Sequence, residues 1–95
     1  MKFKSNAKNK EKLKDASIFW LKDNSLKICI HKFVGCGDTL FLDCHSLDID
    51  NCDLDTEDFN EAVSKAKEVI SVKMKRLREE AYRFCMDNHV EIVGN

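Results

Sequence analysis

The chain has 95 residues, of which 43% are hydrophobic and 35% charged, and its formal net charge is −1. These values suit one ordinary globular domain with a single modest core, rather than a disordered chain. No apolar run approaches the roughly 20 residues of a membrane helix, and the start lacks the apolar stretch of a secretory signal. The odd count of five cysteines favours reduced thiols. We therefore expect a cytoplasmic protein.

The first 15 residues are rich in Lys and Asn and contain few apolar side chains. Such a segment holds poorly against a core, because buried apolar surface is needed to offset the conformational entropy that ordering removes. We therefore expect residues 1–15 to form a basic flexible arm and residues 16–95 to form a single α+β domain.

Three strands are predicted after the arm. Residues 17–21 are rich in aromatic and β-branched side chains, and residues 26–34 alternate between apolar and polar ones, so the two segments indicate a hairpin. Gly35 and Gly37 supply the positive φ angles of a second tight turn, and residues 39–44 follow as a third strand. The sequence therefore predicts a three-stranded antiparallel sheet.

The near-zero net charge conceals a separation of charge along the chain. Between Lys32 and Lys65 there are nine acidic side chains and no Lys or Arg, whereas both flanks are mainly basic. Since steering and partner choice follow the local field, this pattern predicts a charged partner or a second copy of the chain. The acidic residues that we expect to contact it are Asp43, Asp48, Asp50, Asp53, Asp55, Glu57, Asp58 and Glu61.

Apolar residues recur at three- and four-residue intervals from Phe59 to Phe84, which predicts one long C-terminal helix packed on the sheet, with Asp55 or Thr56 as its N-cap. Such a helix spans about 45 Å, more than twice the length of a strand. Its far half is therefore expected to break, to bend into a second helix or to pack on another chain in a homodimer. Residues 89–93 are the candidate for a short final strand. The candidate oligomer contacts are Leu77, Ala81 and Phe84.

Cysteine and histidine gather near the predicted strands, and zinc takes four nitrogen or sulfur ligands. The candidate ligands are His31, Cys36, Cys44, His45 and Cys52. Against zinc, no pair of these residues has the close spacing of a zinc knuckle, and Cys44 and His45 would point to opposite faces of a strand. Against Ca²⁺, the acidic segment fits no register of the EF-hand loop. We therefore predict no metal and no cofactor, while an irregular Ca²⁺, Mg²⁺ or zinc site stays an open alternative.

No catalytic motif accompanies these residues. A cysteine nucleophile needs a general base, but His45 diverges from Cys44 along a strand. The acidic trio that could serve a metal-dependent nuclease is Asp43, Asp48 and Glu61. Most of the acidic residues are explained equally well by solubility and helix capping, so we expect no enzyme.

Three segments resemble the strand, strand, helix run of HicB-type antitoxins, whose helix commonly carries Glu-Ala-Leu, two variable residues and Ala-Lys-Glu. They are Leu26–Val34, Thr39–Cys44 and the run Glu61-Ala62-Val63-Ser64-Lys65-Ala66-Lys67-Glu68-Val69-Ile70. The resemblance covers about residues 26–80. Residues 44–48 replace the family's Pro- and Gly-containing stretch, and no segment matches its DNA-binding part. The resemblance implies a partly degenerate ribonuclease H type fold that neutralises a small basic ribonuclease toxin, without repression of an operator.

These patterns predict a non-catalytic inhibitor that occupies a basic, nucleic-acid-processing protein, its carboxylates standing in for phosphates. An antitoxin, an immunity protein and an inhibitor encoded by a phage or mobile element are three settings for this activity. The alternative is a small RNA- or DNA-binding module that uses the Lys-rich arm and the basic helix face. In that case Trp20, Phe33 and Phe41 are candidates to stack on bases.

Overall fold

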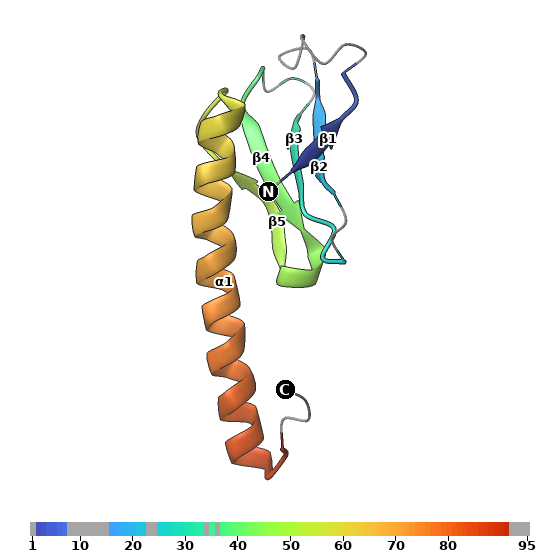
Figure 1. The fold of residues 1–95 in the computed structure, drawn as a ribbon. Helices are drawn as coiled ribbons and strands as arrows, with labels where there is room; N and C mark the ends of the chain where they lie inside the picture. Colours follow the sequence, from blue (N-terminus) through green and yellow to red (C-terminus); the bar gives the residue numbers. More distant parts are fainter. Residues whose placement is uncertain (1, 8–15, 23–24, 34, 36, 92–95) are drawn as a thin grey trace.

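The computed structural model describes residues 2–7, 16–22, 25–33, 35 and 37–91. A single sheet forms one layer, and one helix lies across one of its faces and runs on past the end of the sheet (Figure 1). The elements are β1 (Phe3–Ser5), β2 (Ile18–Leu21), β3 (Cys29–Lys32), β4 (Leu40–Cys44), the short 3₁₀ turn η2 (His45–Leu47), β5 (Ile49–Asp53) and α1 (Phe59–Asn88).

The sheet is an antiparallel meander in the order β1-β2-β3-β4-β5, so each strand pairs with its neighbour in sequence. The predicted α+β class, with an antiparallel sheet and one long helix, is confirmed. The three predicted strands correspond to β2, β3 and β4, and Gly35 and Gly37 adopt the expected positive φ angles of 87° and 66°. The sheet has five strands rather than three, because β1 and β5 flank this central hairpin pair.

Strand β1 lies within the segment that we predicted to be a free arm. Phe3 contacts Phe59 of α1 edge to face, with ring centroids 5.4 Å apart. The Asn6 side chain accepts hydrogen bonds from two backbone amides at the start of β2, at 2.9 and 3.2 Å. One aromatic ring and one amide side chain thus attach residues 3–6 to the sheet, whereas residues 8–15 lie outside the described residues.

Strand β5 lies in the acidic segment, for which the sequence predicted no strand. Ile49 is buried opposite Cys44, and the pairing with β4 shifts at a bulge where Asn51 has a φ angle of 49°. Leu54 is buried immediately after the strand. The bulge interrupts the two-residue alternation, which is why the apolar pattern of β5 is difficult to recognise in the sequence.

Helix α1 is continuous over its 30 residues, so of the three expected alternatives neither the break nor the bend into a second helix is present. Its N-cap is Asp58, and not Asp55 or Thr56, because the Asp58 carboxylate accepts a hydrogen bond from the Glu61 amide at 2.9 Å. The helix buries Ala62, Ala66 and Ile70 against the sheet. These small and medium side chains let α1 lie close to the strands.

The helix ends at Asn88, and His89 follows in the left-handed conformation with its amide bonded to the carbonyl of Cys85. Residues 89–91 form a turn and coil rather than the predicted final strand, whose remaining residues lie outside the described ones. No helix among the described residues is long and apolar enough to cross a membrane.

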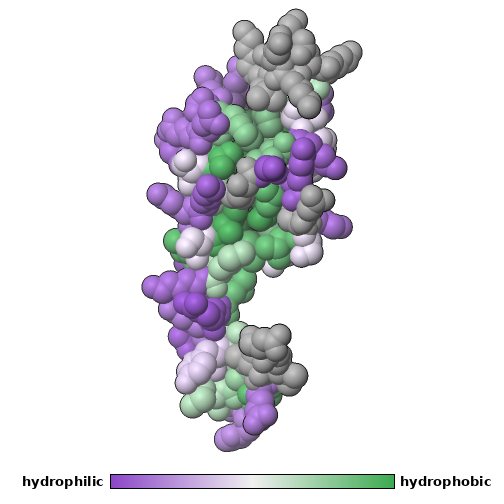
Figure 2. All heavy atoms as spheres, in the orientation of Figure 1, coloured by the Kyte–Doolittle hydropathy of each residue, from purple (hydrophilic) through white to green (hydrophobic). Residues whose placement is uncertain are grey.

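The core lies between the sheet and the first half of α1. Its buried side chains come from β2, β3, β4, β5, α1 and the connections between them, and they include Phe19, Ile30, Leu40, Leu42 and Leu54. In Figure 2, apolar residues gather where helix and sheet meet, and hydrophilic residues line the outer side of the helix. The radius of gyration is 16.2 Å, well above the about 12 Å of a compact domain of this length, because the second half of α1 extends beyond the core.

Candidate functional site

Seven exposed carboxylates lie along β5 and its connection to α1. They are Asp48, Asp50, Asp53, Asp55, Glu57, Asp58 and Glu61, and we call this set the acidic edge. Strand β5 is the last strand on its side of the sheet, so no strand of the described residues pairs with its outward backbone groups. The structure therefore gathers seven of the eight predicted contact residues on one rim of the fold.

The chain path explains why acidic residues suit these positions. Asp48 and Asp55 adopt left-handed backbone conformations, with φ angles of 55° and 51°, which Asp tolerates better than most residues. The Asp53 carboxylate accepts a hydrogen bond from the Asp55 amide at 2.7 Å, and Asp58 caps the helix. Some of the carboxylates thus have local structural roles in addition to their negative charge.

Within the described residues, Lys and Arg side chains leave most of this charge without an ion pair. Among the ion pairs within the described residues, one involves the acidic edge: Lys65 Nζ lies 3.2 Å from Glu61 Oε1. The Lys65 ammonium also donates to the Asp55 carbonyl at 3.2 Å. The other six carboxylates project from the rim without such a pair, and they set the negative potential of this edge.

Asp43 does not lie with the acidic edge. It belongs to β4, one strand further in, and points to the side of the sheet opposite α1, because Leu42 and Cys44 on either side of it are buried beneath the helix. Its side chain is 24% exposed, and its Oδ2 lies 3.6 Å from His45 Nε2. Within the described part of the chain, Asp43 Oδ1 is buried and has no hydrogen-bond partner.

The side of the sheet opposite α1, which we call the back face, carries a cluster of aromatic rings. Phe33 packs edge-on against both His31 and Phe41, with centroids 4.8 and 4.9 Å apart. The bulge in β5 brings Asn51 to His31, where Asn51 Oδ1 lies 3.0 Å from Nε2. Trp20 and Phe33 are each 38% exposed on this face, as the base-stacking alternative requires, but Phe41 is largely covered by its neighbours.

Cys29 also lies on the back face, directly opposite Asp43 in the antiparallel register. Burial raises the pKa of the Cys29 thiol above its ordinary value, and the nearby Asp43 carboxylate raises this pKa further. Both effects disfavour the thiolate, which is the nucleophilic form. Cys29 is thus a poor candidate for covalent chemistry.

The candidate metal ligands that the structure describes are spread over different parts of the fold. The Cys44 thiol is buried and donates to the Leu26 carbonyl at 3.1 Å, whereas His45 beside it is exposed and His31 lies on the back face. Cys36 lies outside the described residues. Among the residues that the structure describes, no group of three or more His, Cys, Asp or Glu side chains is placed to hold a metal ion.

No family model, curated protein or solved structure matches this chain. The resemblance to HicB-type antitoxins therefore stays a prediction from the sequence.

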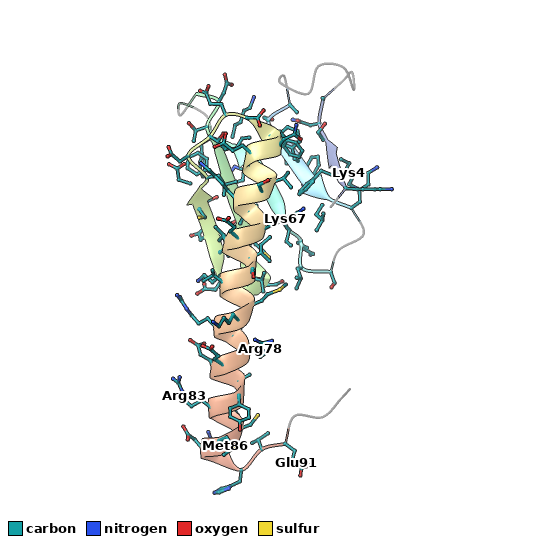
Figure 3. The ribbon with its side chains drawn as sticks, turned by 60° about the vertical axis from the view of Figure 1, so that its left-hand side comes forward. Lys4, Lys67, Arg78, Arg83, Met86 and Glu91 are labelled. Atoms are coloured by element: carbon teal, nitrogen blue, oxygen red, sulfur yellow. The ribbon has the colours of Figure 1, made fainter. Side chains whose placement is uncertain are left out.

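The last 18 residues of α1, residues 71–88, form another distinctive surface, which we call the distal helix. Nearly every residue of it is exposed, including the predicted oligomer contacts Leu77, Ala81 and Phe84. Figure 3 shows Lys67 beside the sheet, and Arg78, Arg83 and Met86 beyond its end. Val72, Tyr82 and Met86 are also exposed on this helix, and their only signal in the sequence is their place outside the apolar stripe.

Proposed function

We propose that this protein is a non-catalytic inhibitor that binds a basic, nucleic-acid-processing protein, such as a nuclease, through the acidic edge. The observation that carries the proposal is the row of six exposed carboxylates, free of ion pairs with described residues, on the outermost strand and its connection to α1. A row of fixed negative charges resembles the phosphates that such a partner binds. It accelerates association even where each exposed pair contributes little.

The position of the charges at a sheet edge also favours one kind of occupant over another. An open edge strand is a template for pairing with a further strand, and a second copy of β5 would bring Asp50 and Asp53 against the same like charges. A basic partner experiences attraction at the same place. The acidic edge therefore discourages edge-to-edge self-pairing while it attracts a cationic surface.

Three settings fit this activity: an antitoxin, an immunity protein, and an inhibitor encoded by a phage or mobile element. The resemblance to HicB-type antitoxins supports the first of these, with a small basic ribonuclease as the partner. In each setting the inhibitor acts by covering a cationic cleft, and it needs no reactive group of its own.

The test compares two variants with the same loss of negative charge. In the edge variant, Asp50 and Asp53 become Asn. In the control variant, Glu79 and Glu91, which are exposed and lie outside the acidic edge, become Gln. The partner is first captured from a host lysate by the immobilised protein and identified by mass spectrometry. Its Kd for each variant is then measured by surface plasmon resonance at several salt concentrations.

We expect the edge variant to bind the partner at least about tenfold more weakly at low salt and with a smaller salt dependence, and the control to bind like the native protein. Unchanged binding of the edge variant, or an equal loss in the control, would contradict the proposal. If instead the isolated protein binds RNA or DNA tightly, and Lys75→Gln with Arg78→Gln abolishes this binding, the nucleic-acid alternative is correct.

A further inference from the structure

An apolar stripe runs from Ile70 into the distal helix, where the described residues leave much of it exposed. Ile70, Met74, Leu77, Ala81 and Phe84 are spaced by four, three, four and three residues, the repeat that places side chains along one seam of a helix pair. Ile70 is buried against the sheet, whereas Met74, Leu77 and Phe84 are 43%, 40% and 58% exposed. The stripe thus continues the sheet-packing face of α1 after the sheet has ended.

We propose that a second copy of this chain covers the stripe, so that the distal helices of two copies pack antiparallel about a two-fold axis near residue 79. This dimer is independent of the proposed binding of a basic partner. In this register Met74 faces Phe84 of the second copy, and Leu77 faces Ala81. Large side chains then meet small or flexible ones on both sides of the axis.

The sheet selects the antiparallel orientation. In a parallel pair, Ile70 of one copy would have to meet Ile70 of the other, but each Ile70 is already 92% covered by its own core, and the two sheets would collide there. In the antiparallel register Ile70 lies opposite Asn88, the last residue of the helix. The second copy therefore ends where the sheet begins, and the helices overlap over residues 70–88, about 28 Å.

Charges beside the stripe fit the same arrangement. Lys73, Glu80 and Asp87 lie at seven-residue intervals along one side of the seam. In the antiparallel register, Lys73 of each copy therefore faces Asp87 of the other. These two opposite-charge pairs are related by the axis. Glu80 faces Glu80 of the second copy near the axis, and Arg78 meets Arg78 on the other side, which weakens the dimer. For a dimer held by one helix pair, with two attractive and two repulsive charge contacts, we expect a Kd on the order of 10 μM.

The first test is sedimentation equilibrium of the full chain between about 1 and 300 μM, a range that brackets the expected Kd. We expect a monomer–dimer equilibrium in the native protein. Leu77→Asp and Phe84→Asp each bury a charge in the seam and should raise the dimer Kd at least about 100-fold. Met86→Asp makes the same kind of change on the opposite side of the helix and should leave the Kd unaltered. Far-UV circular dichroism confirms that each variant folds.

The second test determines the orientation by reversing charges. Lys73→Glu or Asp87→Lys alone should weaken the dimer, and the two together should restore it, because the pair forms between copies only in the antiparallel register. Glu80→Gln removes the repulsion at the axis and should tighten the dimer. A native protein that stays monomeric throughout the range overturns the proposal, as does an equal effect of Met86→Asp or a double variant that remains weak.

Discussion

Phe3 of β1 and Phe59 of α1 meet edge to face with ring centroids 5.4 Å apart, and so join two elements that are more than 50 residues apart in sequence. Phe59 also stacks on Phe19 of β2, at 4.2 Å between centroids. The first residue of the helix is therefore held by rings from two strands. This contact fixes where α1 begins over the sheet, directly after the acidic edge.

Replacing Phe59 with Ala should lower the free energy of unfolding by about 2–4 kcal/mol, because it removes a ring from the core and leaves Phe3 and Phe19 without their partner. Urea denaturation followed by circular dichroism measures the change. Tyr82→Ala is the matched control, since Tyr82 is an aromatic residue of the same helix that is 63% exposed. A loss of similar size in both variants would show that the ring contacts do not anchor the helix.

Replacing Asn6 with Ala should destabilise the attachment of β1. The variant loses the acceptor of the Ser17 and Ile18 amides, and the bond from Asn6 Nδ2 to Ser17 Oγ at 2.7 Å. We expect about 1–2 kcal/mol less stability in urea. Limited proteolysis should also cleave the N-terminal residues faster. Asn60→Ala, at an exposed position in the first turn of α1, should change neither measurement.

The charge and the capping role of Asp58 can be separated by two substitutions. Asp58→Ala removes the acceptor of the Glu61 amide and should cost about 1 kcal/mol of stability, whereas Asp58→Asn keeps a capping oxygen and should cost much less. Thermal unfolding measures both. Equal destabilisation by Ala and Asn would mean that the negative charge at the helix N-terminus, rather than the cap, provides the stability.

Asp43→Asn should make Cys29 more reactive. Burial remains in this variant, but the carboxylate that also raises the pKa of the thiol is gone, so the pKa falls toward its ordinary value and more thiolate forms. Iodoacetamide labelling at a fixed alkaline pH, with the modified site found by mass spectrometry, should proceed faster at Cys29. Asp48→Asn, on the acidic edge, is the control, and an unchanged Cys29 rate in Asp43→Asn would refute the electrostatic contribution.

The same pKa shift has a consequence for stability. Because folding raises the pKa of Cys29, the folded state holds this proton more tightly than the unfolded chain does. The resulting stability is fully present below the ordinary thiol pKa of 9.0 and is lost as the pH rises through the higher pKa of the folded state. Cys29→Ser should therefore show a weaker decline of unfolding free energy above pH 9 than the native protein.

The strongly periodic parts of the fold were predictable from the sequence, and the sparsely apolar strands were not. The seven-turn stripe from Phe59 to Phe84 is long enough to indicate its helix without ambiguity, and β3 alternates clearly. In β1, a single ring at Phe3 carries the packing. In β5, the left-handed Asn51 shifts the alternation, so Ile49 and Leu54 read as isolated residues in a polar loop.

The acidic edge was largely predictable because it is contiguous in sequence, and its exceptions have backbone causes. Asp55 was an equally good capping residue by type, but its left-handed conformation places it before the helix, and Asp58 takes the cap. Asp43 was grouped with the other acids by proximity in sequence, and the alternation of β4 turns it to the back face. The contact of Asn51 with His31 depends on the bulge in β5, which no local sequence pattern predicted.

The straight course of α1 keeps its two ends far apart. Asp58 at one end and Asn88 at the other are separated by about 45 Å. The acidic edge and the far end of the distal helix therefore lie at opposite ends of the helix. In a two-fold assembly built on its far end, the two acidic rims point to opposite ends, and two partner molecules could be captured at once, with the gain in avidity that bivalence brings.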